Sequence, residues 1–400
     1  MATRDLRRPG TVRLARPKPL LPGVPTARER SGPPVVLATV TPGLEAVAIA
    51  EIIETVSGAV IVSTSRGKVY ARVPALDPAL TDLRTVDNLY LYLGEVEVGV
   101  RRVDLSALGT AVASLGGVIG LFRHRESDWG DSPSFVVNAS RIGKQAYSRF
   151  DAATAVAQAI ALKVPGWTNA TPAVIHTVAR RDLDDEGDAA PRFARSTVEL
   201  RLDILGQRGV VGWRLTPPSF RFRGQMRAFA PGSILPTVAN ALVRMSEPRN
   251  DDVFLDPFAG TGTILAERAT TDALAVIGTE IDSDVIPGLR PGRVGASANG
   301  SRVFEADARR LPVRDGTVDA VVSNLPFGRQ VLDEDAIVPL YIDAARELRR
   351  VMSPNGRAIL MTTRVDVIEA AMGAAGFVGE VLTTISLNGQ NPSVLRYIRV

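Results

Sequence analysis

The sequence contains no cysteine and only two histidines. Without cysteine, the chain can form no disulfide framework and no thiolate-based zinc site or nucleophile. His124 and His176 are too few for a histidine-rich metal site, and we interpret both as surface or structural residues. We therefore expect no metal cofactor.

Long hydrophobic runs are also missing. The longest apolar stretch, residues 107–122, is too short for a membrane-spanning helix and contains four glycines. We interpret it as a buried helix followed by a loop. The N-terminus lacks the apolar core of a secretory signal. We expect a cytoplasmic monomer with no membrane partner.

Lysine is scarce, with four residues, so arginine dominates the basic side chains. The formal net charge is only +4, but the sequence pI of about 9.6 favours an anionic partner. A length of 400 residues suggests two or three domains.

Residues 1–34 form a proline-rich basic segment with only two acidic residues. Such a composition cannot bury a core, so we expect a disordered basic tail. It either adds non-specific attraction to phosphate or is a solvated tail without a role.

Residues 35–205 mix helices and strands without strict alternation, which is typical of α+β folds. In 35–95, strands are expected at 35–40, 59–63, 68–73 and 85–92, with a helix at 44–56. In 96–205, helices are expected at 104–115 and 151–164, with Asp151 as N-cap, and strands at 134–139, 173–179 and 196–205. Arg141 and Lys144 follow the 134–139 strand as candidate RNA-binding residues.

Acidic residues are absent from 204–245, where arginines alternate with aromatic residues. Guanidinium groups pair with phosphates and aromatic faces stack on bases, so this composition favours nucleic-acid binding. We place a basic aromatic linker at 206–233, although residues 210–215 can form a strand. The alternative is a linker whose arginines are solvated and whose aromatics pack between domains. The candidate RNA-binding residues here are Arg214, Arg221, Arg223 and Arg227.

From about residue 251 onward strands and helices alternate strictly, which predicts a doubly wound α/β domain. We place this domain at 234–400. Strands are expected at 253–255, 273–279, 302–304, 320–323, 358–362, 378–386 and 394–400. Helices are expected at 263–270, 340–352 and 366–375. Because no helix separates the last two strands, we expect a hairpin that makes the final strand antiparallel.

A glycine-rich loop, Asp256 to Thr263, follows the first of these strands and precedes a helix. Glycines let a ligand contact backbone, and a helix N-terminus favours an anionic group. A dinucleotide fingerprint requires a glycine where Leu265 stands, so nicotinamide binding is disfavoured. Glu280 ends the second strand and can accept hydrogen bonds from ribose hydroxyls. Asp307 ends the third strand and can accept a hydrogen bond from an adenine amino group.

The fourth strand ends in Asn324-Leu325-Pro326-Phe327. The Asn324 side-chain oxygen and the Leu325 carbonyl can accept the two hydrogens of an exocyclic amine, and Phe327 can stack on its ring. These contacts point the nitrogen lone pair at a methyl donor, so catalysis is largely orientation and electrostatics. The alternative is a turn in which Pro326 merely ends a strand and Phe327 packs in the core.

Together, the glycine loop, the strand-end acids and Asn-Leu-Pro-Phe resemble the S-adenosylmethionine-dependent N-methyltransferases of Rossmann-like fold. More narrowly, the sequence resembles the THUMP-containing tRNA guanine-N2 methyltransferases over residues 35–400, loosely in 95–205. Thr41 to Glu45 and Asp87 to Leu89 resemble the start of that family's N-terminal portion.

The resemblance implies an N-terminal ferredoxin-like domain at 35–95, a THUMP-like RNA-binding domain at 96–205 and a Rossmann-like methyltransferase domain at 234–400. It implies that Asp256, Gly260 and Gly262 hold the methionine part of S-adenosylmethionine, Glu280 the ribose and Asp307 the adenine. Further cofactor-binding candidates are Phe258, Thr263, Asp282 and Ala308. Prolines and glycines in 283–300 interrupt the helix that the family has there, so contacts from that segment are not predicted.

The sequence therefore predicts a tRNA guanine-N2 methyltransferase, with the acceptor stem as the expected location. A base inside a stem must be flipped out to reach such a pocket, and Arg329 beside the motif is a candidate RNA contact. Three alternatives remain open: a ribosomal RNA guanine-N2 methyltransferase, a DNA adenine-N6 methyltransferase and a non-catalytic RNA-binding protein.

Overall fold

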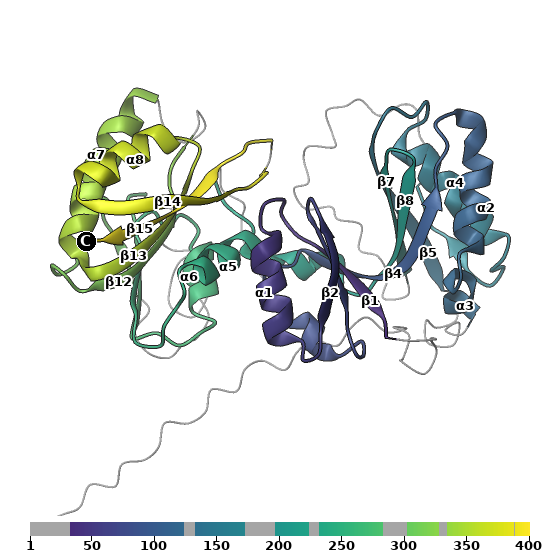
Figure 1. Cartoon of the computed structure of the whole chain (residues 1–400), viewed down its shortest axis with the longest axis horizontal. Coiled ribbons are helices and arrows are strands. Elements are labelled where there is room, and N and C mark those ends of the chain that lie inside the picture. Colours follow the sequence, from purple (N-terminus) through teal and green to yellow (C-terminus); the bar gives the residue numbers. More distant parts are fainter. Residues whose placement is uncertain are drawn as a thin grey trace, which may run out of the picture.

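The computed structural model describes residues 33–123, 133–172, 197–223, 232–282, 302–327, 334–387 and 389–400. Most of the basic tail, the strand expected at 173–179 and the segment 283–300 lie outside these residues. Arg227 and Arg329 lie outside them as well. In Figure 1 two sheets lie toward opposite ends of an elongated molecule.

The N-terminal sheet has eight strands in the order β2-β3-β1-β4-β8-β7-β5-β6. Its strands are β1 (Val35–Thr39), β2 (Val60–Ser65), β3 (Lys68–Arg72), β4 (Asn88–Glu97), β5 (Ser134–Ile142), β6 (Thr168–Asn169), β7 (Thr197–Leu205) and β8 (Arg208–Arg214). The helices of this region are α1 (Glu45–Thr55), α2 (Leu105–Ser114), α3 (Val118–Arg123) and α4 (Arg149–Ala161), with short 3-10 turns η2 (Pro78–Thr81), η3 (Arg102–Asp104) and η5 (Pro218–Phe222). β5 is parallel to β6 and β7, and the other pairs are antiparallel, so the sheet is mixed.

This sheet is continuous across residue 95. β4 pairs with β1 on one side and with β8 on the other. β8 lies within the expected linker 206–233, yet it pairs with β4 and β7 over its whole length. The structure therefore places the residues expected for two N-terminal domains and the start of the linker in one sheet.

Two helical expectations are corrected. Residues 116–123 were expected as a loop, but the chain forms α3, whose Phe122 packs edge-on against Phe135 and Trp167. α4 begins at Arg149, not at Asp151, because Ser148 is the N-cap and accepts from the Asp151 backbone amide. Asp151 completes the capping box by accepting from the Ser148 amide.

The C-terminal sheet has seven strands in the order β11-β10-β9-β12-β13-β15-β14. Its elements are α5 (Pro236–Met245), β9 (Val253–Asp256), α6 (Thr263–Arg268), β10 (Ala275–Glu280), β11 (Arg302–Glu305), β12 (Val318–Asn324), α7 (Glu334–Val351), β13 (Met352–Thr362), α8 (Val365–Ala374), β14 (Phe377–Thr384) and β15 (Ser393–Arg399). β9 to β13 are parallel, and β15 is antiparallel to β13 and β14. The expected antiparallel last strand is confirmed.

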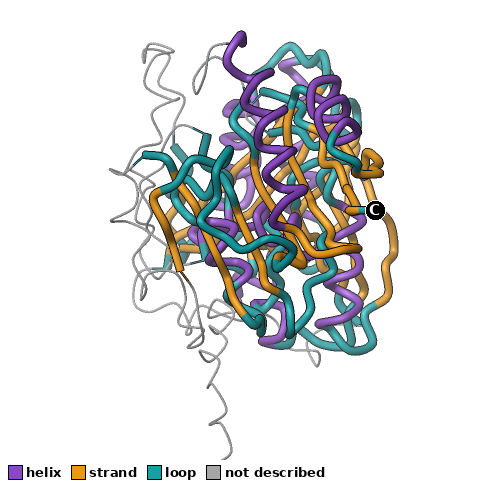
Figure 2. The backbone as a smooth tube through the Cα atoms, turned by 90° about the vertical axis from the view of Figure 1, so that its left-hand side faces the viewer, coloured by secondary structure: helices purple, strands orange, loops and turns teal. Residues whose placement is uncertain are grey.

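Alternating side chains of this sheet belong to two cores. Phe254 and Val322 pack with α5 and α6, whereas Leu255 and Val321 pack with α7 and α8. Because successive residues of a strand point to opposite faces, helices cover both faces. Seen from the C-terminal end of the molecule, helices flank the strands (Figure 2). The doubly wound α/β expectation is confirmed.

Hydrogen bonds join the two regions at α6. The guanidinium of Arg84 donates to both carboxylate oxygens of the fully buried Glu267, at 2.7 and 2.9 Å. The Asn240 amide donates to the same carboxylate at 3.0 Å. Thr237 also donates to Asp87 at 2.7 Å. α6 is the helix that follows the glycine loop, and these bonds hold α5 and α6 against the N-terminal region.

Candidate active site

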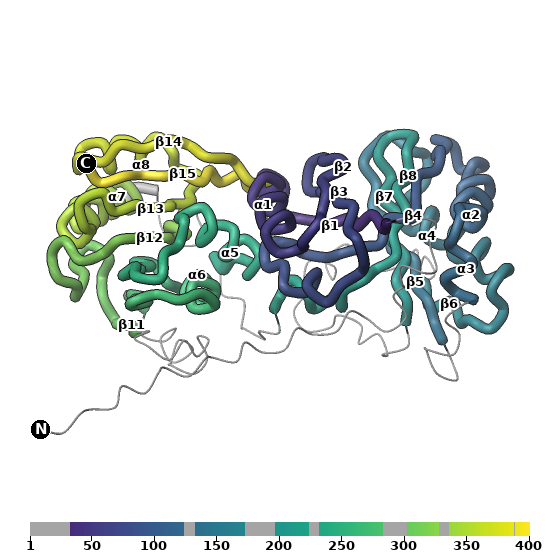
Figure 3. The backbone as a smooth tube through the Cα atoms, turned by 60° about the horizontal axis from the view of Figure 1, so that its bottom comes forward, coloured from purple at the N-terminus to yellow at the C-terminus, as the bar shows by residue number. Residues whose placement is uncertain are grey.

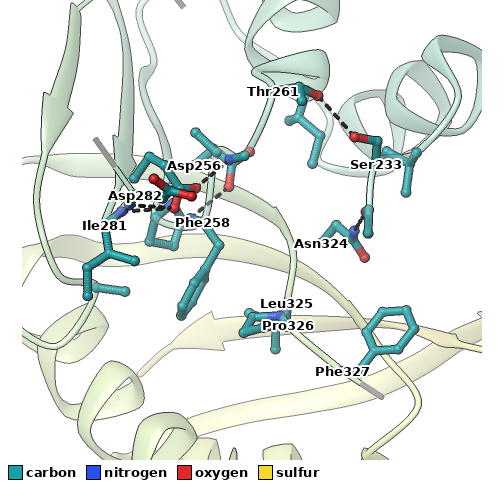
Figure 4. A pocket seen from close by; sticks show the side chains of 18 of the residues that line it. Ser233, Asp256, Phe258, Thr261, Ile281, Asp282, Asn324, Leu325, Pro326 and Phe327 are labelled. Atoms are coloured by element: carbon teal, nitrogen blue, oxygen red, sulfur yellow. Dashed lines mark hydrogen bonds between the residues drawn. The ribbon is translucent and has the colours of Figure 1, made fainter. Parts of the chain in front are cut away.

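The candidate site lies where the sheet order reverses. β9 and β12 are neighbours although β10 and β11 follow β9 in the chain. The carboxyl ends of parallel strands on either side of such a switch point leave a crevice in which ligands bind. Asp256 ends β9 and Asn324 ends β12. Figure 4 shows both side chains at this edge.

The glycine loop after β9 contains two residues with left-handed backbone conformation. Gly260 has φ +50° and Gly262 has φ +72°, values that residues other than glycine rarely adopt. A Cβ built on Gly260 would meet no atom within 4 Å. The loop is held in place by a hydrogen bond from the Ala259 amide to the Thr279 carbonyl at 2.9 Å. The space beside Gly260 is therefore available to a ligand.

Glu280 ties the end of β10 to this loop. One carboxylate oxygen accepts from the Gly260 amide at 2.7 Å, and the other accepts from the amides of Ile281 and Asp282 at 2.9 and 3.1 Å. Each carboxylate oxygen has two lone pairs. Glu280 thus shapes the loop and keeps acceptor capacity for a hydroxyl.

Asp256 is buried below the loop. Its carboxylate accepts from the Ser323 hydroxyl at 2.7 Å and from the Phe258 amide at 3.2 Å. Burial is the main cause that raises the pKa of Asp256 to about 7, and the nearby Glu280 charge contributes to the same rise. The bond from Ser323 links the glycine loop to the residue that precedes Asn324.

Asp307 lies two residues after the end of β11 and pairs with Arg309. The closest distance between the guanidinium and the carboxylate is 2.6 Å. This hydrogen bond, with that from the Arg309 backbone amide, holds the pKa of the carboxyl below its usual range. Arg309 was not predicted from the sequence, although its position two residues after Asp307 was an available signal.

The Asn324 amide is half satisfied. Its Nδ2 donates to the Gly232 carbonyl at 2.9 Å. Its Oδ1 is shielded from solvent and has no hydrogen-bond partner within the described residues. Buried acceptors almost always have a donor, so an orphaned oxygen in a cavity wall indicates a missing partner. One hydrogen bond thus orients the Asn324 side chain, and its acceptor oxygen stays without a donor.

The rest of the motif is fixed by the neighbouring strand and helix. The Leu325 amide donates to the Met361 carbonyl at 3.0 Å, which continues the pairing of β12 with β13. The Pro326 carbonyl accepts from the Tyr341 hydroxyl at 3.0 Å. The Tyr341 hydroxyl is also hydrogen-bonded to the Thr362 hydroxyl at 2.8 Å, and burial raises the pKa of Tyr341 to about 12. The motif is therefore a rigid wall, which argues against an ordinary turn.

These elements enclose a cavity of about 760 Å³. Of the predicted cofactor and acceptor residues, all line it except Gly262, which positions the loop. Residues distant in sequence complete the lining and were not predicted: Gly232, Ser233 and Ile234 before α5, and Leu387, Gln390 and Pro392 in the β14–β15 hairpin. Figure 4 shows Ser233 beside Asn324. The Ser233 and Thr261 hydroxyls are hydrogen-bonded at 3.4 Å. Only tertiary structure brings these segments to the site.

The described candidates for RNA binding differ in their surroundings. Lys144 is exposed and without a partner in the described part of the chain. Arg141 donates to the Gln145 carbonyl at 2.9 Å. Arg221 packs over the Phe222 ring, 4.7 Å from its centroid.

Two arginines in this set have contacts inside the protein. Arg214 is largely buried and pairs with Glu199 at 2.7 Å. Arg223 donates to the Val86 carbonyl at 2.7 Å and lies 4.0 Å from the Phe220 ring centroid. Burial, and next the charge of Arg84, lower the pKa of Arg223 to about 10. Arg214 is thus engaged in an ion pair, whereas Arg223 donates to a backbone carbonyl and its Nε has no hydrogen-bond partner among the described residues.

No group of three or more histidine, cysteine, aspartate or glutamate side chains suited to a metal ion occurs among the described residues. Helices of the described chain are also too short or too polar to cross a membrane.

Residues 223–390 match a family model described as "RMKL-like, methyltransferase domain". A tRNA (guanine(6)-N2)-methyltransferase of Thermus thermophilus is 32% identical over 182 residues, which cover 44% of this chain and 53% of that protein. The human tRNA (guanine(6)-N(2))-methyltransferase THUMP3 is 28% identical over 207 residues, or 48% of this chain and 40% of that protein. The chain thus matches about half the length of these relatives.

The likeness of the whole structure extends beyond the methyltransferase domain. The crystal structure of TrmN from Thermus thermophilus has a TM-score of 0.67 and 24% identity, covering 92% of this chain and all of that one. At this identity the likeness establishes the fold. The resemblance to the tRNA guanine-N2 methyltransferases that the motifs predicted is confirmed. The THUMP-like character of residues 96–205 stays a prediction.

Proposed function

We propose that the chain is an S-adenosylmethionine-dependent methyltransferase that forms N2-methylguanosine in tRNA. The observation that carries this proposal is the buried, unpartnered Oδ1 of Asn324 in the wall of the cavity beside the glycine loop. A buried acceptor without a donor costs about 1–3 kcal/mol. An amine hydrogen placed there removes that cost.

The glycine-loop half of the cavity fits the cofactor. The open space beside Gly260 allows close approach to backbone. Asp256, when ionised, attracts the ammonium group of the amino-acid part. Glu280 keeps one lone pair for a ribose hydroxyl, and Asp307, once partly released from Arg309, accepts a hydrogen bond from the adenine amine. When bound, S-adenosylmethionine supplies an electrophilic methyl group. No metal is part of this proposal.

The other half fits a planar amine. Asn324 Oδ1 and the Leu325 carbonyl accept the two amine hydrogens, which directs the nitrogen lone pair toward the cofactor half. The Phe258 and Phe327 rings lie on either side of Leu325 and Pro326 in Figure 4, and Phe327 offers a face for the base. The groups are preorganised by Gly232 and Tyr341. Orientation of this kind supplies roughly 7–11 kcal/mol.

The choice of a guanosine in tRNA rests on the relatives, whose printed names specify that product. A base in a helical stem must be flipped out of its stack at a cost of a few kcal/mol. The N-terminal sheet gives the protein a second region with which to hold structured RNA while the base is extruded. We place the modified nucleotide in the acceptor stem.

Product identification tests this proposal. The protein is incubated with S-adenosylmethionine and bulk tRNA from a strain lacking the modification, and the RNA is digested to nucleosides for mass spectrometry. We expect N2-methylguanosine. N6-methyladenine as the sole product would contradict the guanine assignment, and transfer to ribosomal RNA alone would contradict the tRNA assignment. Binding of tRNA without any transfer would identify a non-catalytic RNA-binding protein.

A further inference from the structure

A second hollow, of about 550 Å³, lies between the N-terminal sheet and the methyltransferase domain. Thr64, Ser65 and Arg66 line it from the β2–β3 turn, and Ser386 and Asn391 line it from the β14–β15 hairpin. Figure 3 shows this hairpin extending toward α1 and the adjacent β-strands of the N-terminal region. The lining consists mainly of side chains that can donate hydrogen bonds to an anion.

The two sides of this hollow are fixed to each other. The Ser386 amide donates to the Pro42 carbonyl and the Thr383 hydroxyl to the Gly43 carbonyl, both at 2.9 Å. Gly43 has φ +100°, and a Cβ there would lie 2.3 Å from the Thr384 carbonyl oxygen. Only glycine permits this approach. The hollow therefore has a defined width.

Glu45 fixes the turn that carries Arg66. One carboxylate oxygen accepts from the Gly67 amide at 2.5 Å and the other from the Gly43 amide at 2.9 Å. With both oxygens held by backbone donors, Glu45 does not pair with Arg66. The Arg66 guanidinium is exposed and has no partner among the described residues. It is a free cation on a fixed turn.

The second hollow adjoins the candidate active site. Leu387 and Gln390 exchange two hydrogen bonds of 2.9 Å and close a tight turn. Gln390 and Pro392 line the first cavity, whereas Asn391 between them lines the second hollow. The two hollows thus lie on opposite sides of one short turn.

We propose that the second hollow binds a phosphate of the RNA backbone, next to the nucleotide whose base enters the first cavity. Arg66 supplies the charge and a planar set of donors that matches phosphate oxygens. The hydroxyls of Ser65 and Ser386 and the Asn391 amide supply neutral donors from both regions. Because one phosphate is held by both, the site fixes how far along the strand the extruded base can lie. This inference rests on the proposed function.

The test compares Arg66→Ala with the wild-type chain in binding to bulk tRNA at several salt concentrations. We expect a Kd about tenfold higher at low salt and a slope of log K against log salt that falls by about 1, as for the loss of one phosphate contact. Methyl transfer should show a raised KM for tRNA and an unchanged kcat. Arg66→Lys should restore most of the affinity.

Arg302→Ala is the matched control. Arg302 is an exposed arginine at the amino end of β11, opposite the carboxyl edge that carries the site, and its loss changes the net charge equally. If both variants change the salt slope alike, or if Arg66→Ala changes nothing, the phosphate site is wrong. A wild-type chain that binds tRNA but transfers no methyl contradicts the proposed function, while the Arg66 slope still decides the phosphate site. A chain that binds no tRNA contradicts both.

Discussion

Several charged side chains of the N-terminal sheet are paired with one another, whereas Asn324 in the methyltransferase cavity is only partly satisfied. On the sheet, Lys68 and Arg201 both pair with the buried Asp203, and Arg214 pairs with Glu199. In the cavity, Asn324 keeps an acceptor without a donor. Side chains that satisfy one another stabilise the fold, whereas groups held rigid but unsatisfied are available to a ligand.

The same contrast occurs within the methyltransferase domain. Before the amino end of β9, Asp252 pairs with Arg357 at 2.6 Å and lies 3.6 Å from Arg268. At the carboxyl end of the same strand, Asp256 has no cationic partner among the described residues and accepts only from a hydroxyl and an amide. One strand thus has a structural acid at one end and a ligand-accessible acid at the other.

The largest effect is expected from Asn324→Ala, which removes the unsatisfied acceptor. We expect kcat to fall about 10²- to 10³-fold, as for the loss of one preorganised polar group that acts in the transition state. Cofactor and tRNA affinities should stay within about twofold, because Asn324 acts on the amine alone. Single-turnover rates and equilibrium binding with the same preparation measure both. Unchanged turnover would contradict the role of Asn324.

A smaller effect is expected from Arg214→Ala, which leaves Glu199 buried without its cation. We expect a loss of about 3 kcal/mol in the free energy of unfolding, and no change in the salt dependence of tRNA binding. Arg208→Ala on the same strand is the control. The Arg208 side chain is 57% exposed and its ion pair with Glu95 is long, at 3.6 Å, so its loss should change stability very little. Denaturant unfolding and salt-dependent binding distinguish the two roles. A reduced salt slope with full stability would restore Arg214 as an RNA contact.

The smallest effect concerns the pH dependence of cofactor binding. Burial raises the pKa of Asp256 to about 7, so the neutral acid predominates below that pH and the carboxylate above it. Because the cationic cofactor prefers the carboxylate, affinity should rise with pH by up to about tenfold per unit below 7 and level off above. Asp256→Asn should remove this slope. Calorimetry between pH 5.5 and 8.5 measures it, and a slope that persists in Asp256→Asn would assign the proton to another group.

The sequence predicted most of the methyltransferase half because its signals are local. Strand-end residues such as Glu280 and Asn324 lie next to buried apolar runs, and parallel strands place their carboxyl ends at one edge. The seven strands and the antiparallel final strand were predicted for the same reason. Helix α5 was missed, although residues 236–245 begin with a proline suited to a first helical turn.

What the sequence could not supply depends on contacts between distant segments. Ser233 and Gln390 reach the cavity only through tertiary packing. Arg214 looks like a nucleic-acid contact in an acid-free stretch, but its partner Glu199 comes from the neighbouring strand β7. Composition along the chain does not show cross-strand pairing, so an arginine in a closed ion pair and an arginine free for phosphate have the same sequence signal.

The measurement that tests the central claim most directly is a calorimetric titration of S-adenosylmethionine into the chain without RNA at pH 8, where Asp256 is ionised. We predict one binding site per chain. In Gly260→Val, which fills the open space beside the loop, we predict that binding is lost while the circular dichroism spectrum is retained. Absence of binding to the wild-type chain, or equal binding to a folded Gly260→Val variant, would contradict the assignment of this cavity to the cofactor.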